Sequence, residues 1–522
     1  MKRLAWYGWV AVVCVTLVAW GTARAADWYV DRENSNPAPN GTSSNPFTNI
    51  TDAVAAANAN DAIYVADGVY NAAVGETFNW TVDHNLSFYG GYVGLDGGSW
   101  NSSRTPRSTI IDPNSANRVI DMTSVTLTFD GFTVRNSQVA GSAGTINCDA
   151  NPSAIVHIND CVFTNCASTA NNGGALHTEY GYMGGGTITT SEFVNCYGGG
   201  IGGALYFGLD TGKQMLIKDC VFRGCHQDSA LGDTGTGIAI GGGAIMLMME
   251  GGSLCEFESC TFTSNTAASV SGGGAVLVVG QQSSASTVTV KRCVFEYNTC
   301  DGSGGGAAGI GCKMGWPGFV NFYVENSLFY RNTGNAALGS RPNWTGARTF
   351  SVKHCTIAYT QTNTVWWTGM GIYTGDNYPS GTDDETLIIN NCIIAHNFRF
   401  GILHEEHANP GLGPYDLTYN DVYDNYPRGY PADVGTNYWG GDNAAITAYN
   451  TTPPTGGLKV DPKFVDPDNN NFRLLSSSDC ADSGTDLGIT VDLVGATRPL
   501  GAGYDMGCYE NNFAIGTVLL VR

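Results

Sequence analysis

Side chains that could bind or cleave a sugar are concentrated between positions 313 and 407. Two histidines and two glutamates form the run HEEH at residues 404–407, and three acidic residues stand at 383–385. Paired carboxylates serve glycoside hydrolysis, and a basic side chain beside a neutralising group serves elimination at a uronic acid. The candidate catalytic residues are therefore His404, Glu405, Glu406, Asp383 and Asp384.

Tryptophan is concentrated in the same region, where indole faces could stack on sugar rings. Four of the eleven tryptophans stand between positions 316 and 367, and a guanidinium group lies among them. Aromatic and charged groups that converge in a groove are typical of a ligand site. The candidate ligand-binding residues are Trp316, Trp344, Trp366, Trp367 and Arg341. The alternatives are tryptophans packed against the flank of the fold and a solvated HEEH loop.

These residues do not predict a metal site. In a strand, the two histidines of HEEH would point to opposite faces, which argues against zinc. The acidic run DPDNNN at 466–471 could take calcium, although an ordinary turn is the alternative. We therefore predict no firm cofactor, with Ca2+ as the cation to test.

A repeat running from about residue 125 to 430 must position these residues. Copies such as INDCVFTNC, IKDCVFRGC and VKRCVFEYN share an aromatic position, and many continue with Gly-Gly-Ala and an aliphatic residue. Aligned, the copies give an aromatic column, an amide column and a thiol column: Phe163, Phe193, Phe222, Phe262, Phe295, Phe329; Asn265, Asn298, Asn332, Asn397; Cys161, Cys220, Cys260, Cys293, Cys355, Cys392.

The repeat predicts stacked coils of parallel strands. Segments such as STVTVKRCVF alternate in the manner of strands, and each copy is too short to bury its own apolar face. Stacking places equivalent residues about 4.8 Å apart, so phenylalanines would pack on phenylalanines and asparagines would hydrogen-bond from coil to coil. The Gly-Gly pair would allow a positive φ and a close backbone approach at a bend.

The paired FxxN and GGA(I/L/V) elements resemble the repeats of chlamydial polymorphic outer-membrane proteins and of bacterial right-handed parallel β-helix repeat proteins. The resemblance implies an all-β fold, a right-handed single-stranded parallel β-helix of the pectate-lyase-like kind. Residues 28–71 resemble the opening of secreted β-helices, in which a short helix covers the first coil. That helix is expected at 50–59, with Thr51 as its N-cap and Ile50, Val54 and Ala57 facing the core.

The C-terminal segment resembles the end of bacterial surface β-helices of the choice-of-anchor type. The matching residues include Asp461-Pro462, Arg498-Pro499 and Asp505-Met506-Gly507. We expect four regions: a signal peptide at 1–25, an N-terminal cap and first coils at 26–112, β-helix repeats at 113–435, and last coils with a surface-associated C-terminal cap at 436–522.

The N-terminus and the charge indicate export. Lys2 and Arg3 precede an apolar run, and Ala23-Arg24-Ala25 is a cleavage site typical of a signal peptide. No transmembrane span is expected after cleavage. A net charge of −21 argues against nucleic acid as a partner. We predict a monomer, secreted or on the outer cell surface, whose partner is an extracellular polysaccharide or surface glycan.

Two classes of function remain open on the residues alone. The first is a non-catalytic surface protein that binds glycans or adheres through its loops and a lateral groove. The alternative is a polysaccharide lyase or glycoside hydrolase that uses the same groove. The Asp-Pro-x-His-Asp, Asn-Thr-Asp and Gly-His-Gly motifs of epimerases and polygalacturonases are absent from the sequence, and the fold is common to both classes.

Most cysteines are expected to fill the core as small apolar side chains. Two bridges remain conceivable. One would join neighbours among Cys166, Cys196 and Cys225, which stand on successive coils, and the other would join Cys480 to Cys508.

Overall fold

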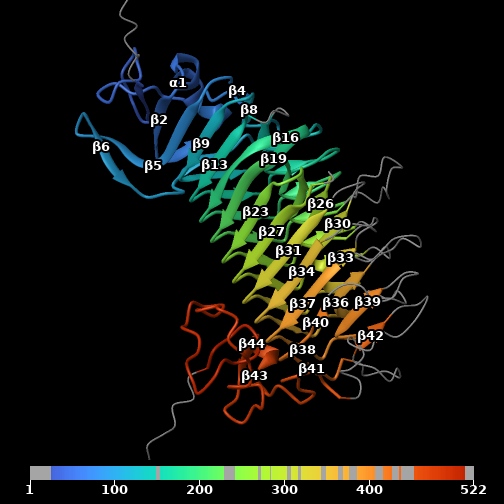
Figure 1. Cartoon of the computed structure of the whole chain (residues 1–522). Helices are drawn as coiled ribbons and strands as arrows, with labels where there is room; N and C mark the ends of the chain where they lie inside the picture. The colour runs from blue at the N-terminus through green and yellow to red at the C-terminus, as the bar shows by residue number, and fades with distance from the viewer. Residues whose placement is uncertain are drawn as a thin grey trace, which may run out of the picture.

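The computed structural model of the 522-residue chain describes residues 25–148, 153–228, 241–268, 272–281, 284–301, 307–314, 319–341, 348–362, 368–375, 385–405, 415–425, 434–436 and 452–511. These residues form one elongated stack of coils that begins at the short helix α1, Ile50–Ala56 (Figure 1). The predicted signal peptide lies outside the described residues.

Each coil contributes strands to parallel ladders that run the length of the stack. The first ladder contains β4 (Trp80–Val82), β8 (Ile120–Met122), β12 (Ile146–Cys148), β16 (Leu176–Thr189), β19 (Leu205–Lys218), β22 (Ile245–Met249), β26 (Val276–Gly280), β30 (Ala307–Met314), β33 (Ala336–Arg341), β36 (Met370–Gly375), β39 (Ile402–Glu405) and β42 (Val434–Thr436).

The second ladder shares the long strands β16 and β19 with the first. It also contains β1 (Asp27–Val30), β2 (Asp61–Ala66), β5 (Leu86–Asp96), β9 (Thr126–Asp130), β13 (Ile155–Asn159), β23 (Leu254–Glu258), β27 (Ser286–Lys291), β31 (Val320–Glu325), β34 (Arg348–Lys353), β37 (Glu385–Asn390) and β40 (Tyr415–Asp416). The antiparallel strand β6 (Ser99–Arg104) turns back on β5 as a hairpin that projects from the first coils (Figure 1).

The third ladder consists of short strands on the opposite side of the core. Its members are β3 (Gly68–Tyr70), β7 (Thr109–Ile111), β10 (Phe132–Arg135), β14 (Val162–Thr164), β17 (Glu192–Val194), β20 (Val221–Arg223), β24 (Thr261–Thr263), β28 (Val294–Glu296), β32 (Leu328–Tyr330), β35 (Thr356–Ala358), β38 (Ile393–Ala395) and β41 (Asp421–Tyr423). A minor ladder follows it, with β11 (Gln138–Val139), β15 (Ala167–Ser168), β18 (Tyr197–Gly198), β21 (His226–Gln227), β25 (Thr266–Ala267) and β29 (Thr299–Cys300).

Left-handed residues turn the chain around the third ladder. Strand β14, for example, is preceded by Asp160 with φ 48° and followed by Asn165 with φ 54°. The Gly-Gly pair makes a further bend: Gly242 has φ 77°, and a Cβ on Gly243 would lie 2.0 Å from the carbonyl oxygen of Gly274. The first glycine of the pair therefore provides the positive φ, and the second allows the backbone of the next coil to approach closely.

The phenylalanine column is a stack of parallel rings in the core. From Phe163 to Phe329, successive ring centroids are 4.7–5.0 Å apart and the planes differ by at most 5°. All six rings are fully buried. Each buried ring contributes roughly 1.5–3 kcal/mol by area, so the stack forms a continuous apolar spine.

The asparagine column is a hydrogen-bonded ladder beside the rings. Asn298 Nδ2 donates to Phe262 O at 2.9 Å and to Asn332 Oδ1 at 3.0 Å, while its Oδ1 accepts from the main-chain N–H of Asn265 at 3.0 Å. The ladder resumes with Asn397, which donates to Asn425 Oδ1 at 2.7 Å. These amides satisfy buried backbone groups at the turn that follows each short strand.

The described cysteines are free and buried, so neither conceivable disulfide is present. In the asparagine column, Cys166, Cys196 and Cys225 take the place of the amide, and Cys196 Sγ donates to Phe163 O at 3.6 Å. These thiols thus donate to the preceding coil in the way that the asparagine amides do. Burial raises the pKa of Cys161 to about 12, which keeps that group a neutral thiol.

The capping helix is shorter than expected and has a different cap. Asn49, rather than Thr51, is the N-cap, because its side chain accepts from the N–H of Asp52 at 2.7 Å. The buried carboxylate of Glu76 accepts from the N–H groups of Ile50 and Thr51 at 2.7 and 2.9 Å. Ile50 and Ala53 are buried, and Val54 and Ala57 pack against the core as partly buried residues.

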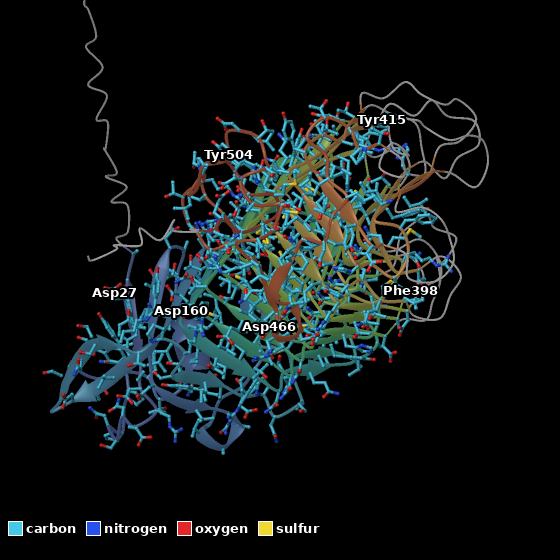
Figure 2. All side chains as sticks on the ribbon, turned by 90° about the horizontal axis from the view of Figure 1, so that it is seen from below. Asp27, Asp160, Phe398, Tyr415, Asp466 and Tyr504 are labelled. Carbon is cyan, nitrogen blue, oxygen red and sulfur yellow. The ribbon has the colours of Figure 1, made fainter. Side chains whose placement is uncertain are left out.

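The C-terminal segment, residues 452–511, packs against the side of the coils in addition to following the last ones. Its strands β43 (Phe464–Asp466) and β44 (Asn471–Leu474), joined by the short 3-10 helix at Pro467–Asn469, form an apolar cluster with side chains of β32, β35 and β38. In Figure 2, the labelled Asp466 and Tyr504 of this segment lie to the left of Phe398 and Tyr415.

Candidate functional site

The predicted sugar-binding residues fall mostly outside the part of the chain that the structure describes. This holds for Trp316, Trp344, Trp366, Trp367, Asp383, Asp384 and Glu406. Arg341 and Glu405 are the last residues of β33 and β39. The roles of all these residues in sugar binding or catalysis stay predictions.

His404 lies in the interior, not in an open groove. Its side chain has no exposed surface, Nδ1 is 2.8 Å from Thr374 Oγ1, and Nε2 is 3.2 Å from Tyr415 Oη. The register places it in the inward column that also holds Cys312, Ser340 and Thr374. The alternative of a solvated HEEH loop is therefore wrong for His404, because this position of β39 points inward.

The second ladder alternates between outward and buried positions, and two of its outward rows flank one of its buried columns. Strand register defines the first row as Asp27, Ala62, Ser87, Thr128, His157, Thr187, Leu216, Glu256, Thr289, Tyr323, Ser351, Ile388 and Asp416. The second row is Tyr29, Tyr64, Tyr89, Asp130, Asn159, Thr189, Lys218, Glu258, Lys291, Glu325, Lys353 and Asn390. We call the surface made by both rows the open face.

Most side chains of the open face are partly exposed, and only Ser351 and Asn390 among them are buried. The strands that carry the face, from β13 to β37, lie side by side along the stack in Figure 1. Because neighbouring strands are about 4.8 Å apart, each row repeats a surface side chain at that interval. The face is therefore a long, regular array of polar and aromatic groups.

Aromatic rings occupy the N-terminal end of the second row. Tyr29, Tyr64 and Tyr89 stack with centroids 5.4 and 5.5 Å apart. Trp100 from the β5–β6 hairpin meets Tyr29 edge-on at 4.9 Å and lies 5.9 Å from Tyr92. The hairpin is thus held against this end of the face by ring contacts.

Next to the rings, a line of polar groups is hydrogen-bonded from coil to coil. Arg104 contacts Asp130 at 2.5 Å, Asn159 Nδ2 donates to Asp130 Oδ2 at 3.3 Å, and Thr189 donates to Asn159 Oδ1 at 2.8 Å. In the first row, His157 Nδ1 is 2.9 Å from Thr187 Oγ1, and burial lowers the pKa of His157. These contacts fix hydroxyl, amide and imidazole groups at the surface.

Paired charges fill the middle of the face. The second row alternates in sign through Lys218, Glu258, Lys291, Glu325 and Lys353. Lys218 lies 3.0 Å from Glu258, and Lys291 lies 2.8 Å from Glu256. The carboxylate of Glu258 also contacts Arg292 beside the row. Opposite charges on adjacent coils therefore neutralise one another.

A second polar line on the first ladder runs from the partly exposed Asp121 to the buried Asn147 and His177. Arg118 pairs with Asp121 at 3.0 Å, Asn147 donates to Asp121 at 2.8 Å, and His177 Nδ1 is 3.1 Å from Asn147 Oδ1. His177 is 2% exposed, and burial with the nearby Arg118 charge lowers its pKa to about 4. Its ring stacks on Tyr206 at 5.3 Å. This line is a hydrogen-bonded network that ends in a buried, neutral imidazole.

Sequence reasoning did not single out either polar line. The available signal was the alternation within each strand, which marks Thr289 and Lys291 of STVTVKRC as outward residues. The GGA element likewise marks the residue after its aliphatic position, such as His177 in GGALH. Which outward residues become neighbours depends on the register between coils, and loops of unequal length conceal that register.

Comparison with known proteins agrees with the architecture. Residues 33–203 match the family described as "Protein of unknown function (DUF1565)", and residues 207–452 match the family described as "Right handed beta helix region". The chain is a right-handed parallel β-helix repeat protein. No curated protein matches it.

Two solved lyase structures are similar to the chain at low identity. "Crystal structure of pectate lyase Pel9A" is 14% identical, with 94% of this chain and 98% of that chain covered and a TM-score of 0.39. "Rhamnogalacturonan lyase" is 15% identical, with coverages of 70% and 85% and a TM-score of 0.29.

Two statements hold for the described part of the chain. Its His, Cys, Asp and Glu side chains form no group of three or more that could hold a metal ion. Its helices include none that is long and apolar enough to cross a membrane.

Proposed function

We propose that the protein is exported and binds an extracellular polysaccharide along its open face. The observation that carries the proposal is the pair of outward rows, which continue over successive coils with side chains in register. The signal-peptide pattern and the resemblance to surface β-helix repeats and choice-of-anchor segments support a location outside the cell.

The arrangement suits a polymer better than a small molecule. A polysaccharide repeats the same ring along its length, and the face repeats polar groups at about 4.8 Å along a straight line. Hydroxyl groups such as Thr128 and Thr187 both donate and accept hydrogen bonds, and so do sugar hydroxyls. Partly exposed tyrosines such as Tyr323 and Tyr89 offer apolar surface for the C–H faces of sugar rings.

A binding assay with matched variants tests the proposal. The mature protein is passed through gels that contain individual polysaccharides, and retardation gives an apparent affinity. Asn159→Ala/Thr187→Ala removes two hydrogen-bonding groups from the open face. At about 1 kcal/mol each, affinity should fall roughly thirtyfold.

The control is Thr261→Ala/Thr263→Ala, which removes two partly exposed hydroxyls from β24 on the opposite side of the core. This variant should bind like the wild type. Equal affinities for all three proteins, or retardation by no polysaccharide, would refute binding at the open face. The catalytic alternative is measured in the same samples as new reducing ends or unsaturated sugar ends.

A further inference from the structure

We propose that the polysaccharide bound at the open face is uncharged, a polymer of neutral sugars rather than of uronic acids. This inference rests on the proposed function and adds the chemical class of the ligand. It follows from how the charges of the face are distributed and from which of them are already paired.

The open face carries an excess of negative charge. Its two rows contain six carboxylates and three ammonium groups: Asp27, Asp130, Glu256, Glu258, Glu325 and Asp416 against Lys218, Lys291 and Lys353. Adding the two adjoining guanidinium groups, Arg104 and Arg292, still leaves one more carboxylate than cations. His157 adds no charge at neutral pH, because burial lowers its pKa.

Four of the five cations of the face form ion pairs with carboxylates of neighbouring coils. Lys218 and Lys291 lie 3.0 and 2.8 Å from glutamate oxygens, and Arg104 lies 2.5 Å from Asp130. The register places Lys353, the fifth cation, beside Glu325 of the preceding coil, without an ion pair between these two described residues. At each of the four paired cations, a uronate carboxylate would have to displace the resident partner, so it would gain little and leave an unpaired acid behind. At Lys353 it would meet the neighbouring carboxylate of Glu325.

The rest of the molecule also disfavours a polyanion. The full chain has a net charge of −21. At low ionic strength such a charge repels a polyuronate before contact. A neutral polymer meets no such barrier, and the threonines, Asn159 and Tyr323 offer it hydrogen bonds and apolar contact without any charge being displaced.

The decisive experiment compares each neutral polysaccharide with its C6-oxidised uronate derivative, so that linkage and shape are matched. We expect the neutral polymer to retard the mature protein and the oxidised polymer to bind at least about tenfold more weakly at low salt. We also expect the affinity for the neutral polymer to change less than about twofold between low and high salt, because no ion pair forms with it.

A further variant tests the same inference by removing carboxylates beside two lysines of the open face. In Glu256→Gln/Glu325→Gln, Lys291 loses its ion-pair partner and Lys353 loses the carboxylate beside it in register, and the oxidised polymer should bind at least about fivefold more tightly than it binds the wild type. The matched control is Asp228→Gln/Glu33→Gln, two charge removals away from the open face. It should leave the preference for the neutral polymer unchanged.

The outcomes separate this inference from the proposed function. If the oxidised polymer binds the wild type as tightly as the neutral one, and Asn159→Ala/Thr187→Ala weakens both, the open face binds glycans but the inference of an uncharged ligand is overturned. If no polymer binds, or if the face variant changes nothing, the proposed function itself fails.

Discussion

Replacement of Asn298 tests whether the asparagine ladder holds adjacent coils together. Its side chain makes four buried hydrogen bonds, donating to Phe262 O and Asn332 Oδ1 and accepting from the main-chain N and Nδ2 of Asn265 at 2.9–3.0 Å. In Asn298→Ala, Asn265 Nδ2 keeps Phe222 O, and Asn332 Oδ1 keeps the N–H of residue 298.

The N–H of Asn265 loses its partner within the core, and the carbonyl of Phe262, which stays paired with Phe295 in the ladder, loses one donor. With about 1 kcal/mol for a hydrogen bond and 1–3 kcal/mol for a buried group left unsatisfied, we expect Asn298→Ala to lower the free energy of unfolding by about 4 kcal/mol. Asn298→Cys should lower the free energy of unfolding by about half as much, because a thiol at this position can still donate: Cys225 in the same column donates to Phe193 O at 3.4 Å.

Aspartate provides the most discriminating variant. Asn298→Asp has nearly the shape of the wild type but turns a carboxylate oxygen toward the oxygens of Phe262 and Asn332. At neutral pH, Asn298→Asp should lower the free energy of unfolding more than Asn298→Ala does. The difference should shrink in acid, where the carboxyl group is protonated and can donate a hydrogen bond.

Urea unfolding followed by circular dichroism and fluorescence gives these free energies, provided that the two transitions coincide. Asn321→Ala is the control, because Asn321 is partly exposed on β31 and its side chain accepts from the N–H of Thr349. This replacement should lower the free energy of unfolding by less than about 1 kcal/mol. A ladder that does not stabilise the stack would show Asn298→Ala within about 0.5 kcal/mol of this control, and an aspartate variant milder than alanine would contradict the assigned donors.

Three other predictions concern titration, thiols and the C-terminal segment. Since His177 is held neutral with a pKa of about 4 against an ordinary 6.5, folding stability should be complete above pH 6.5 and fall by up to about 3 kcal/mol as pH drops to 4. Urea midpoints should show a weaker pH slope in His177→Asn, and an unchanged slope would contradict the assignment. Thiol titration of the unreduced, denatured mature protein should count all fifteen described cysteines, and a count of thirteen would mean a disulfide. Arg498 and Glu510 form a fully buried ion pair at 2.6 Å, so Arg498→Met should lower the free energy of unfolding by about 3–5 kcal/mol, as measured by thermal unfolding. Arg498→Met/Glu510→Leu should lower it distinctly less. Equal losses of stability would show that the unpaired carboxylate is not the cause.

The fold was predictable because neighbouring coils repeat the same chemistry at the same position. A phenylalanine recurring as in Phe262 and Phe295 has one arrangement that buries every copy, which is ring on ring at the strand spacing. The amide column and the Gly-Gly bends follow for the same reason. The N-cap was misassigned because Thr51 and Asn49 are both good caps, and only the position of the Glu76 carboxylate, which also binds Thr51, distinguishes them.

The candidate site was much less predictable. The sequence marks Lys291 as an outward residue, but its partner Glu256 is 35 positions away and is brought close only by the register between β23 and β27. His404 illustrates the converse, since a charged motif suggested exposure and strand alternation turned the ring inward.

The sequence by itself determined the stack: period-two alternation set the strands, and identical columns set which residues share the core. Tertiary structure alone decided which outward residues become neighbours, how their charges cancel, and that residues 452–511 lie along the flank of the coils. The physical reason is that core positions must repeat to be buried at all. Surface neighbours meet through loops whose lengths differ, so their pairing exists only once the coils are stacked.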